Sequence, residues 1–545
     1  MRCGLACPSR RRCTRARAFR IDEDGDGEVT ERHINPWLIA VSVMFATFME
    51  VLDTTVVNVS LPHIAGSLSA TIDEATWALT SYLVANAIIL PMTGWLASTF
   101  GRKRLIMAAV IGFTTSSFLC GLAPNLASLI VFRIIQGATG GVMQPLSQAV
   151  LLEAFSPQDR GKAMGFWGLG IVVAPILGPV LGGWLTDAYS WRWVFYINIP
   201  VGIASLVMTQ LYIFDPPYLR AAGKRSIDYW GIGMLAVGIG ALQFVLDKGQ
   251  QEDWLASNMI LALVVVSALS LGALIVHELT TPEPIVDLRV FKVRSYAVGV
   301  FLMTVVGFVM YGSMVLLPIM LQTLLGYPPI QAGIAMAPRG IGSFFMMPIT
   351  GLLVGRFDAR KLLTTGLVIG GGTMLWLSLL NLQAGYWDIF WPQLIQGAGM
   401  ALLFVPLTTI AMDAIPREKM GYATSLFSLM RNIGGSVGIA VTATMLARQT
   451  QANKVLFNAN VTDTNVAAQS LFLQMRGAFM ASGADLATAT SRAYAAMSGM
   501  VMRQASMVSF VGLFQWLGLV FFIVIPLVLL MKRPRSSSGP GAGAH

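Results

Sequence analysis

Most of the chain between residues 36 and 531 consists of apolar segments about as long as a bilayer is thick. A hydrocarbon core of about 30 Å takes about 20 helical residues. Because 55% of the residues are hydrophobic and only 12% are charged, a water-soluble domain of this length is excluded. The sequence predicts an all-α polytopic membrane protein with fourteen spans, at about 37–60, 76–98, 104–122, 126–149, 163–186, 193–213, 229–246, 258–277, 296–321, 331–354, 362–380, 389–412, 421–446 and 507–531.

Basic residues are distributed unevenly between the predicted loops. If the N-terminus lies in the cytoplasm, the short inner loops contain basic clusters at 102–104, 160–162, 220–225, 289–294, 356–361 and 417–419. The short outer loops contain only Arg192 and Lys248. The positive-inside rule therefore predicts that both termini are cytoplasmic. The net charge of +10 follows from this topology, so no nucleic-acid partner is expected.

The chain contains an internal duplication. The sequence PMTGWL at 91–96 returns as PITGLL at 348–353, an offset of 257 residues, and IQGA at 135–138 returns at 395–398, an offset of 260. Both copies of the basic loop face the same side, which indicates parallel repeats that rock about a central site. We expect a tail (1–34), a six-helix half (35–215), two inserted helices with a linker (216–290), a second six-helix half (291–531) with a long periplasmic loop (447–506), and a cytoplasmic tail (532–545).

Two acidic residues lie inside the first predicted span. At 1.5 Å per residue, Glu50 and Asp53 lie about 20 and 25 Å beyond Pro36, within the hydrocarbon core. An ionised carboxylate there costs about 2.5–3.5 kcal/mol or more unless it faces a partner or a wet cavity. The functional interpretation is a proton or cation site. The alternatives are a structural hydrogen-bond partner for Asp53 and plain cavity lining for Glu50.

Arg133 offers Asp53 a partner of opposite charge. It lies about 10 Å into the fourth span from the outer side, the same depth as Asp53, so an ion pair is geometrically allowed. We hypothesise that protonation of Asp53 from the periplasm loosens this pair and favours the inward-facing state. The alternative is a permanent structural salt bridge.

Glycines and prolines in the fifth predicted span suggest one element that controls conformational change. Pro175, Gly178, Pro179, Gly182 and Gly183 lie in the fifth span, where glycines allow close helix packing and proline permits a kink. This pattern favours a seal between conformations, with ordinary tight packing as the alternative.

The basic turn after the second span is a second candidate element of this kind. It contains Gly94, Gly101, Arg102 and Lys103, and we expect it to lock the cytoplasmic side. The alternative is that these cations only set the topology.

These motifs occur in the order typical of one transporter group. They are LDTTVVN at 52–58, GxLxxxxGRKR at 94–104, RxxQG at 133–137, APxxGPxxGG at 174–183, WRWxFxxNxP at 191–200 and WPQLIQG at 391–397. The chain resembles the fourteen-span EmrB/QacA drug:proton antiporter group of the major facilitator superfamily, most closely its EmrB-type inner-membrane pumps. It departs from the pattern at Ser98, where an acid is usual, and at Arg339, which only part of the group has.

The resemblance implies a proton-coupled exporter of amphiphilic toxic compounds in the bacterial inner membrane, working by drug/H+ antiport and alternating access. It also implies a periplasmic adaptor and an outer-membrane channel as partners. The alternative is a stand-alone exporter of one dedicated metabolite or lipid. We expect the substrate cavity to include Thr54, Asn58, Gln136, Gln396, Arg339 and Arg431.

No pattern indicates an enzyme, a cofactor or a metal site. Asp22, Asp24 and Asp26 match the early positions of an EF-hand loop, but His33 stands where a bidentate glutamate is needed. A solvated charge run is the favoured interpretation. The absence of a phosphate-binding Gly-Lys loop leaves the proton gradient as the expected energy source.

Overall fold

The computed structural model describes residues 21–23, 29–31, 35–215, 227–462 and 464–531. Within the N-terminal tail, β1 (Ile21–Glu23) pairs antiparallel with β2 (Val29–Glu31). Asp24 and Asp26 of the acidic run lie outside the described residues, as do the basic cluster at 220–225 and both basic tails.

Helices account for nearly all of the remaining described residues. The first part of the chain contains α1 (Pro36–Ser67), α2 (Ile72–Ala75), α3 (Trp77–Ile89), the 3-10 helix η1 (Leu90–Met92), α4 (Thr93–Phe100), α5 (Arg102–Leu122), α6 (Leu126–Ala154), α7 (Arg160–Ala188), α8 (Trp193–Tyr196) and α9 (Asn198–Tyr212). The middle contains α11 (Tyr229–Lys248), η2 (Trp254–Ala256), α12 (Asn258–Thr280) and η3 (Leu288–Lys292). The last part contains α13 (Arg294–Thr323), α14 (Pro329–Val354), α15 (Ala359–Leu377), α16 (Tyr386–Asp413), η4 (Arg417–Lys419), α17 (Met420–Asn458), α18 (Val466–Ala481) and α19 (Leu486–Val528).

The predicted helical membrane fold is confirmed, with the β1–β2 pair as its only sheet within the described residues, although the exact number of spans is not. Thirteen helical stretches within the described residues are long and apolar enough to cross a membrane. Helix α15, which has 19 residues and occupies the predicted segment 362–380, is not among them. Its basic first turn and its run of glycines lower its mean hydropathy. The count of fourteen spans stays a prediction.

Local capping explains where several helices begin. Asn35 accepts a hydrogen bond from the Trp37 backbone N–H (3.0 Å), and Pro36 occupies the first turn of α1. Asn125 caps α6 in the same way through the Ser128 N–H (2.9 Å). These caps satisfy backbone donors that would otherwise lack a partner at the end of a membrane helix.

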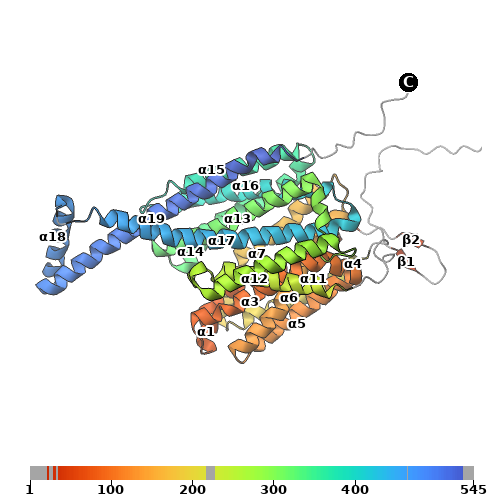
Figure 1. Ribbon diagram of the computed structural model, residues 1–545, viewed down its shortest axis with the longest axis horizontal. Helices are drawn as coiled ribbons and strands as arrows, with labels where there is room; N and C mark the ends of the chain where they lie inside the picture. The colour runs from red at the N-terminus through yellow and green to blue at the C-terminus, as the bar shows by residue number, and fades with distance from the viewer. Residues whose placement is uncertain (1–20, 24–28, 32–34, 216–226, 463, 532–545) are drawn as a thin grey trace, which may run out of the picture.

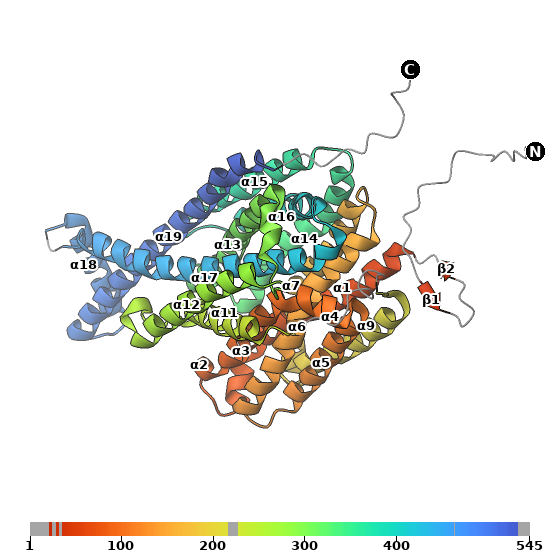
Figure 2. The same ribbon diagram turned by 45° about the vertical axis from the view of Figure 1, so that its right-hand side comes forward.

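The helices form two packed groups with a pair of helices beside them (Figures 1 and 2). In the first group, α1 packs on α6, α7 and α9, and α6 also contacts α3 and α5. In the second, α13 packs on α17, and α16 contacts α14 and α15. The groups meet where α7 contacts α14 and where α17 contacts α4 and α6. Helices α11 and α12 pair with each other, and α11 also reaches α3 and α17.

Helices α17 and α19 are much longer than a bilayer requires. They contain 39 and 43 residues and project beyond the other helices, where α18 joins them (Figure 1). Most described residues of the predicted long loop at 447–506 are therefore helical, since α17 and α19 continue into it and α18 lies between them. The bounds of this loop stay a prediction. Hydropathy detects the apolar part of a helix and not its polar continuation into water.

At the opposite end of the molecule, the two groups touch through their backbones. We call this the basic end, because it carries the turns at 101–104, 155–160, 356–361 and 414–419. A Cβ on Gly94 would lie 2.6 Å from the Tyr422 backbone nitrogen, and a Cβ on Gly351 would lie 2.7 Å from the Gly161 carbonyl oxygen. Gly94 and Gly351 are equivalent positions of the duplication, so the basic end is closed by two repeat-related contacts.

Replacing Gly351 by valine is expected to separate the groups at the basic end, because the new side chain would overlap the Gly161 carbonyl. Overpacking of this kind costs about 1–3 kcal/mol. Spin labels at the exposed residues Lys162 and Arg356 measure the separation, and their distance distribution is expected to shift to longer values. Gly372→Val is the matched control, since a Cβ there would meet no described atom within 4 Å. An unchanged distance in the Gly351 variant would contradict the prediction.

Candidate functional site

Asp53 of α1 is the centre of a buried polar network. Its side chain is 0% exposed and that of Arg133, on α6, is 1% exposed. Arg133 Nη1 donates to Asp53 Oδ2 at 2.6 Å, while Gln136 Nε2 and Asn198 Nδ2 donate to Oδ1 at 2.9 and 2.8 Å. The carboxylate therefore accepts three side-chain hydrogen bonds, one of them from a cation. This is the pairing of Asp53 with Arg133 that their matching depths allowed.

The guanidinium of Arg133 is held on several sides. Its Nε donates to the Ala78 carbonyl at 3.0 Å, and its Nη1 also donates to Gln136 Oε1 at 2.8 Å. Its charge lies 4.1 Å from the centroid of the Tyr82 ring, which is a cation–π arrangement. Helix α3 supplies both Ala78 and Tyr82. It approaches α6 closely because Gly137 has no Cβ, which would lie 2.3 Å from the Tyr82 carbonyl oxygen.

Asn198 completes this network, and sequence reasoning missed it as a site residue. Its amide bridges Asp53 to Ser117, whose Oγ lies 3.0 Å from Asn198 Nδ2. The signal was present, since Asn198 stands in the WRWxFxxNxP pattern that identified the family. The pattern named the residue, but it did not show that α9 turns this side chain toward α1.

Glu50 lies one turn before Asp53 in a second polar cluster. It is 8% exposed, and its Oε1 accepts from Asn86 Nδ2 of α3 at 3.3 Å. Its Oε2 has no hydrogen-bond partner among the described residues. The positive charge of Arg431, on α17, acts on this carboxylate. Arg431 itself donates to Gln144 Oε1 of α6, so the cluster joins helices of both groups.

The six residues expected to line one substrate cavity occupy separate places. Gln136 is fully buried and bonds to Arg133 and Asp53, so in this structure it belongs to the Asp53 network. Gln396 is buried against α15, where its amide contacts Met374 Sδ at 3.8 Å. Arg431 bonds Gln144, as described above. Depth and polarity suggested the cavity, but the rotation of each helix decides where a side chain points.

The other three residues of that set differ in their exposure. Asn58 is exposed on α1, and the half-buried Thr54 donates to its own helix, at the Val51 carbonyl (2.8 Å). Arg339 Nη2 is buried on α14 with no hydrogen-bond partner among the described residues. A buried guanidinium nitrogen without a partner is costly, so Arg339 remains a candidate for contact with an anionic or polar ligand.

The glycines of α7 place this helix against α1 beside Asp53. A Cβ on Gly178 would lie 2.1 Å from Thr55 Oγ1, and one on Gly182 would lie 2.8 Å from the Val56 carbonyl oxygen. Gly183 is different, because a Cβ there would meet no described atom within 4 Å. Pro175 and Pro179 both lie inside α7. Close packing of α7 on α1 thus begins within one turn of Asp53.

Arg102 and Lys103 of the basic turn bond to other residues of the first group. Arg102 Nη1 and Nη2 contact Glu153 at 2.5 and 2.7 Å, and Asp215 Oδ1 accepts from the Arg102 backbone N–H at 2.6 Å. Lys103 Nζ donates to the Gln210 carbonyl at 2.7 Å. Gly101 allows the turn with φ of +83°. These contacts of Arg102 and Lys103 join α5 to α6 and α9 and stabilise the first group.

Ser98, beside this turn, makes a polar contact between the two groups. Its Oγ lies 3.3 Å from the Tyr422 hydroxyl on α17. A neutral hydrogen bond therefore stands where the family pattern usually has an acid.

Arg133→Gln is expected to lower the free energy of unfolding by about 3–5 kcal/mol, because it leaves the Asp53 carboxylate buried without its cation. The double variant Asp53→Asn/Arg133→Gln removes both charges and is expected to lose clearly less stability than the single variant. Thermal or denaturant unfolding in detergent measures the difference. Lys162→Gln, at an exposed site, is the control. Equal losses in the single and double variants would contradict a buried ion pair.

Comparisons with known proteins agree with this architecture. Residues 43–439 match the sequence profile of the Major Facilitator Superfamily. The chain is similar to "Multidrug export protein EmrB" of Escherichia coli, with 36% identity over 510 residues that cover 93% of this chain and 98% of that protein. It is also similar to the EmrB of Haemophilus influenzae, with 40% identity over 440 residues covering 80% of this chain and 86% of that protein. "Fatty acid resistance protein FarB" of Neisseria gonorrhoeae is 38% identical over 504 residues, which cover 92% and 97%.

Solved structures share the fold at low identity. A human organic anion transporter superimposes with a TM-score of 0.56 and 13% identity, covering 90% of this chain and 100% of that one. The proton:xylose symporter XylE superimposes with a TM-score of 0.56 and 17% identity, covering 76% and 90%. The family match over residues 43–439 and the extended similarity to EmrB lead to one conclusion: this chain belongs to the Major Facilitator Superfamily, in the group of EmrB-type transporters.

Proposed function

We propose that this chain is a proton-coupled multidrug exporter of the bacterial inner membrane and that Asp53 is the group that takes up the proton. The names of the EmrB relatives support multidrug export. One observation supports the role of Asp53 above all others, namely its fully buried ion pair with Arg133 at 2.6 Å. Intramembrane acids of this kind are costly and commonly serve proton or ion pathways.

Protonation of Asp53 would change the interactions of α1 at one defined place. The neutral acid loses the charge attraction of Arg133 and holds the amides of Gln136 and Asn198 less firmly. Helix α1 would then be freer to move against α6 and α9. The α7 glycines contact α1 within one turn of Asp53, so such a movement would alter the α1–α7 contact as well.

The cluster around Glu50 would carry this change toward the second group. Glu50 lies on α1 closer to the basic end than Asp53. It is also within range of an electrostatic interaction with Arg431 on α17. A shift of α1 would therefore change the field at the contact between the groups. In our proposal, the halves 35–215 and 291–531 rock against each other, and the insertion 216–290 stays beside them. The closed basic end fits an outward-facing state if that end is cytoplasmic, as the positive-inside rule predicts.

Amphiphilic toxic compounds are the proposed substrates. The name of the FarB relative mentions fatty acids, which are themselves amphiphiles. We also propose a periplasmic adaptor and an outer-membrane channel as partners. The projecting hairpin of α17, α18 and α19 supports this proposal, since it extends beyond the bundle on the side that the topology assigns to the periplasm (Figure 2).

Uptake of a fluorescent lipophilic cation into inverted membrane vesicles tests the proton role. An imposed pH gradient with an acidic interior is expected to drive uptake by the wild type, whereas Asp53→Asn is expected to reduce it by at least about tenfold, since the variant cannot release a proton. Asp73→Asn, at an exposed acid near the end of α1, is the matched control and is expected to transport normally.

The outcomes separate three cases. Equal gradient-driven uptake by wild type and Asp53→Asn would overturn the role of Asp53. Glu50→Gln would then be the next variant, because Glu50 is the other acid within the α1 span. Uptake by neither protein, with both present in the membrane, would count against a lipophilic cation as substrate.

A further inference from the structure

The hydrogen bonds of Asp53 suit its ionised form and conflict with its protonated form. Oδ2 accepts from Arg133 Nη1, and Oδ1 accepts from Gln136 Nε2 and Asn198 Nδ2, so all three partners present N–H groups. A protonated carboxyl group has an O–H, which needs an acceptor when it is buried. If Asp53 takes up a proton, as the proposed function on which this inference rests requires, one of these partners must turn an acceptor toward it.

Arg133 and Gln136 do not meet this requirement. A guanidinium has no acceptor, so the O–H of the acid belongs on Oδ1, away from Arg133. The amide of Gln136 is held at both ends, because its Oε1 accepts from Arg133 Nη1 at 2.8 Å while its Nε2 donates to Asp53. Turning this amide over would point its NH2 group at the guanidinium. Gln136 is therefore a donor in both protonation states.

Asn198 has the freedom that Gln136 lacks. It is fully buried, and its Oδ1 has no hydrogen-bond partner among the described residues, so no bond at the oxygen holds the amide in its present orientation. The other contact of Nδ2 is Ser117 Oγ at 3.0 Å. The Ser117 hydroxyl now donates to the Phe195 carbonyl at 2.9 Å, but a hydroxyl can accept from an amide nitrogen or donate to an amide oxygen. Ser117 is therefore compatible with either orientation.

We infer that the side-chain amide of Asn198 turns over when Asp53 is protonated. Beside the carboxylate the amide presents Nδ2 as a donor. Beside the protonated acid it presents Oδ1, which accepts the O–H. In each state the other end of the amide lacks a partner, the oxygen in the first and the nitrogen in the second. Since no bond at that far end favours either orientation, the charge on Asp53 decides between them.

This rotation gives α9 a role different from that of α6. Protonation removes the charge attraction between Asp53 and Arg133, which holds α1 to α6. The contact between Asp53 and Asn198 becomes a neutral hydrogen bond, which is weaker than the charged one but persists. Helix α1 therefore keeps a hydrogen bond to α9 in both states, and the movement proposed for α1 pivots about Asn198. Asn198 is a positioning residue for the proton on Asp53.

Three further ionisable side chains interact electrostatically with Asp53. They are Glu50 on α1 itself, Tyr82 on α3 and Cys120 on α5. None of them has a hydrogen bond to Asp53 among the described residues, since Glu50 bonds Asn86 and Cys120 contacts Gln136. They contribute to the electrostatic environment of the proton but present no acceptor to the O–H.

Isotope-edited infrared difference spectroscopy tests the inference. The full-length protein, isotopically labelled at the side-chain carbonyl carbon of asparagine, is reconstituted in lipid nanodiscs and acidified stepwise. Protonation of Asp53 is expected to produce a carboxylic acid C=O band that is missing in Asp53→Asn. Together with this band, the labelled C=O band of Asn198 is expected to move to lower frequency, because its oxygen gains a hydrogen bond. Asn198→Leu identifies the labelled band by removing it.

The outcomes separate this inference from the proposed function. If no acid band depends on Asp53, then Asp53 takes up no proton, and the proposed function fails together with the inference. If the acid band appears while the Asn198 band stays in place or moves to higher frequency, the proton role of Asp53 stands and the inference is overturned. An amide that only donates gains no bond at its oxygen.

The frequency of the acid band is a second readout, which a purely structural role of Asn198 would not change. In Asn198→Leu this band is expected at a higher frequency than in the wild type, because the O–H of Asp53 has lost its acceptor. Equal frequencies in the two proteins would overturn the inference. If Asn198→Leu is misfolded by size-exclusion chromatography, the labelled wild type compared with Asp53→Asn still decides.

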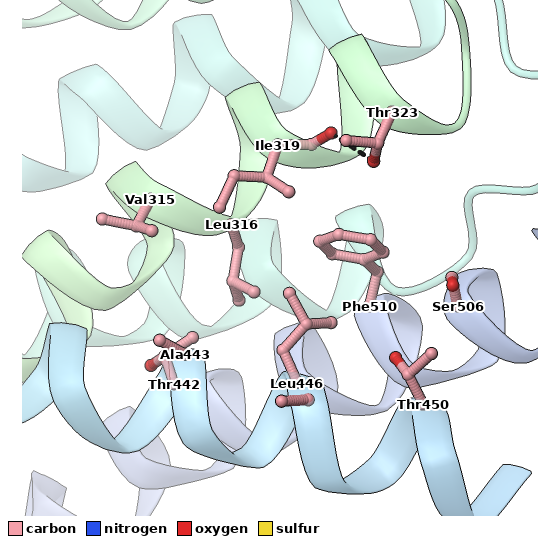
Figure 3. Close-up of a pocket in the computed structure, with 11 residues that line it drawn as sticks. Val315, Leu316, Ile319, Thr323, Thr442, Ala443, Leu446, Thr450, Ser506 and Phe510 are labelled. Atoms are coloured by element: carbon pink, nitrogen blue, oxygen red, sulfur yellow. Dashed lines mark hydrogen bonds between the residues drawn. The ribbon is translucent and has the colours of Figure 1, made fainter. Parts of the chain in front are cut away.

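Two buried threonines provide matched controls. Thr209 lies on α9 like Asn198, and Thr442 lies on α17 in a crevice whose lining includes no residue of the Asp53 network (Figure 3). The hydroxyl of each is buried without a hydrogen-bond partner among the described residues. Thr209→Val and Thr442→Val are therefore expected to leave both bands unchanged. Shifts as large as that in Asn198→Leu would mean that the bands report general packing, and the inference would be wrong.

Discussion

The Asp53–Arg133 ion pair is the interaction on which the arrangement of the first helices depends. Two charges at this depth are tolerated only because each neutralises the other and their remaining hydrogen-bonding groups have partners. The pair therefore requires α1, α3, α6 and α9 to meet around it, and Gly137 permits the necessary approach of α3 to α6. Removal of the charge on Asp53 alone would leave Arg133 buried without a counter-ion and would weaken the contacts among all four helices. That sensitivity is what a proton-driven transporter needs from its coupling residue.

The contact between the two groups of helices combines close backbone packing with polar side-chain contacts. At the basic end, Gly94 and Gly351 bring backbones together, and such contacts hold in one geometry or separate. Deeper in the bundle, Arg431 of the second group bonds Gln144 of the first and acts on Glu50. Because Glu50 and Asp53 lie one turn apart on α1, the proposed proton site and the contact between the groups share one helix.

The sequence and the structure agree on properties that depend only on position along the chain. Hydropathy located the apolar segments, and depth along the helix axis identified Asp53 and Arg133 as possible partners. Depth says nothing about the rotation of a helix, so it could not show that the amide of Gln136 faces Asp53. Asn198 was missed for the same reason, since α9 had to be placed beside α1 before its role was visible. Hydropathy also ended α17 and α19 too early, because their outer turns are polar yet still helical.

The central claim is that Asp53 exchanges its proton when substrate binds. The most direct measurement adds tetraphenylphosphonium to purified protein in a weakly buffered solution containing a pH-sensitive dye, over a series of starting pH values. The account predicts that the wild type releases protons over part of this series and that Asp53→Asn, which still folds and binds the cation, releases none. Equal proton release from both proteins would contradict the account and would place the exchanged proton on another group.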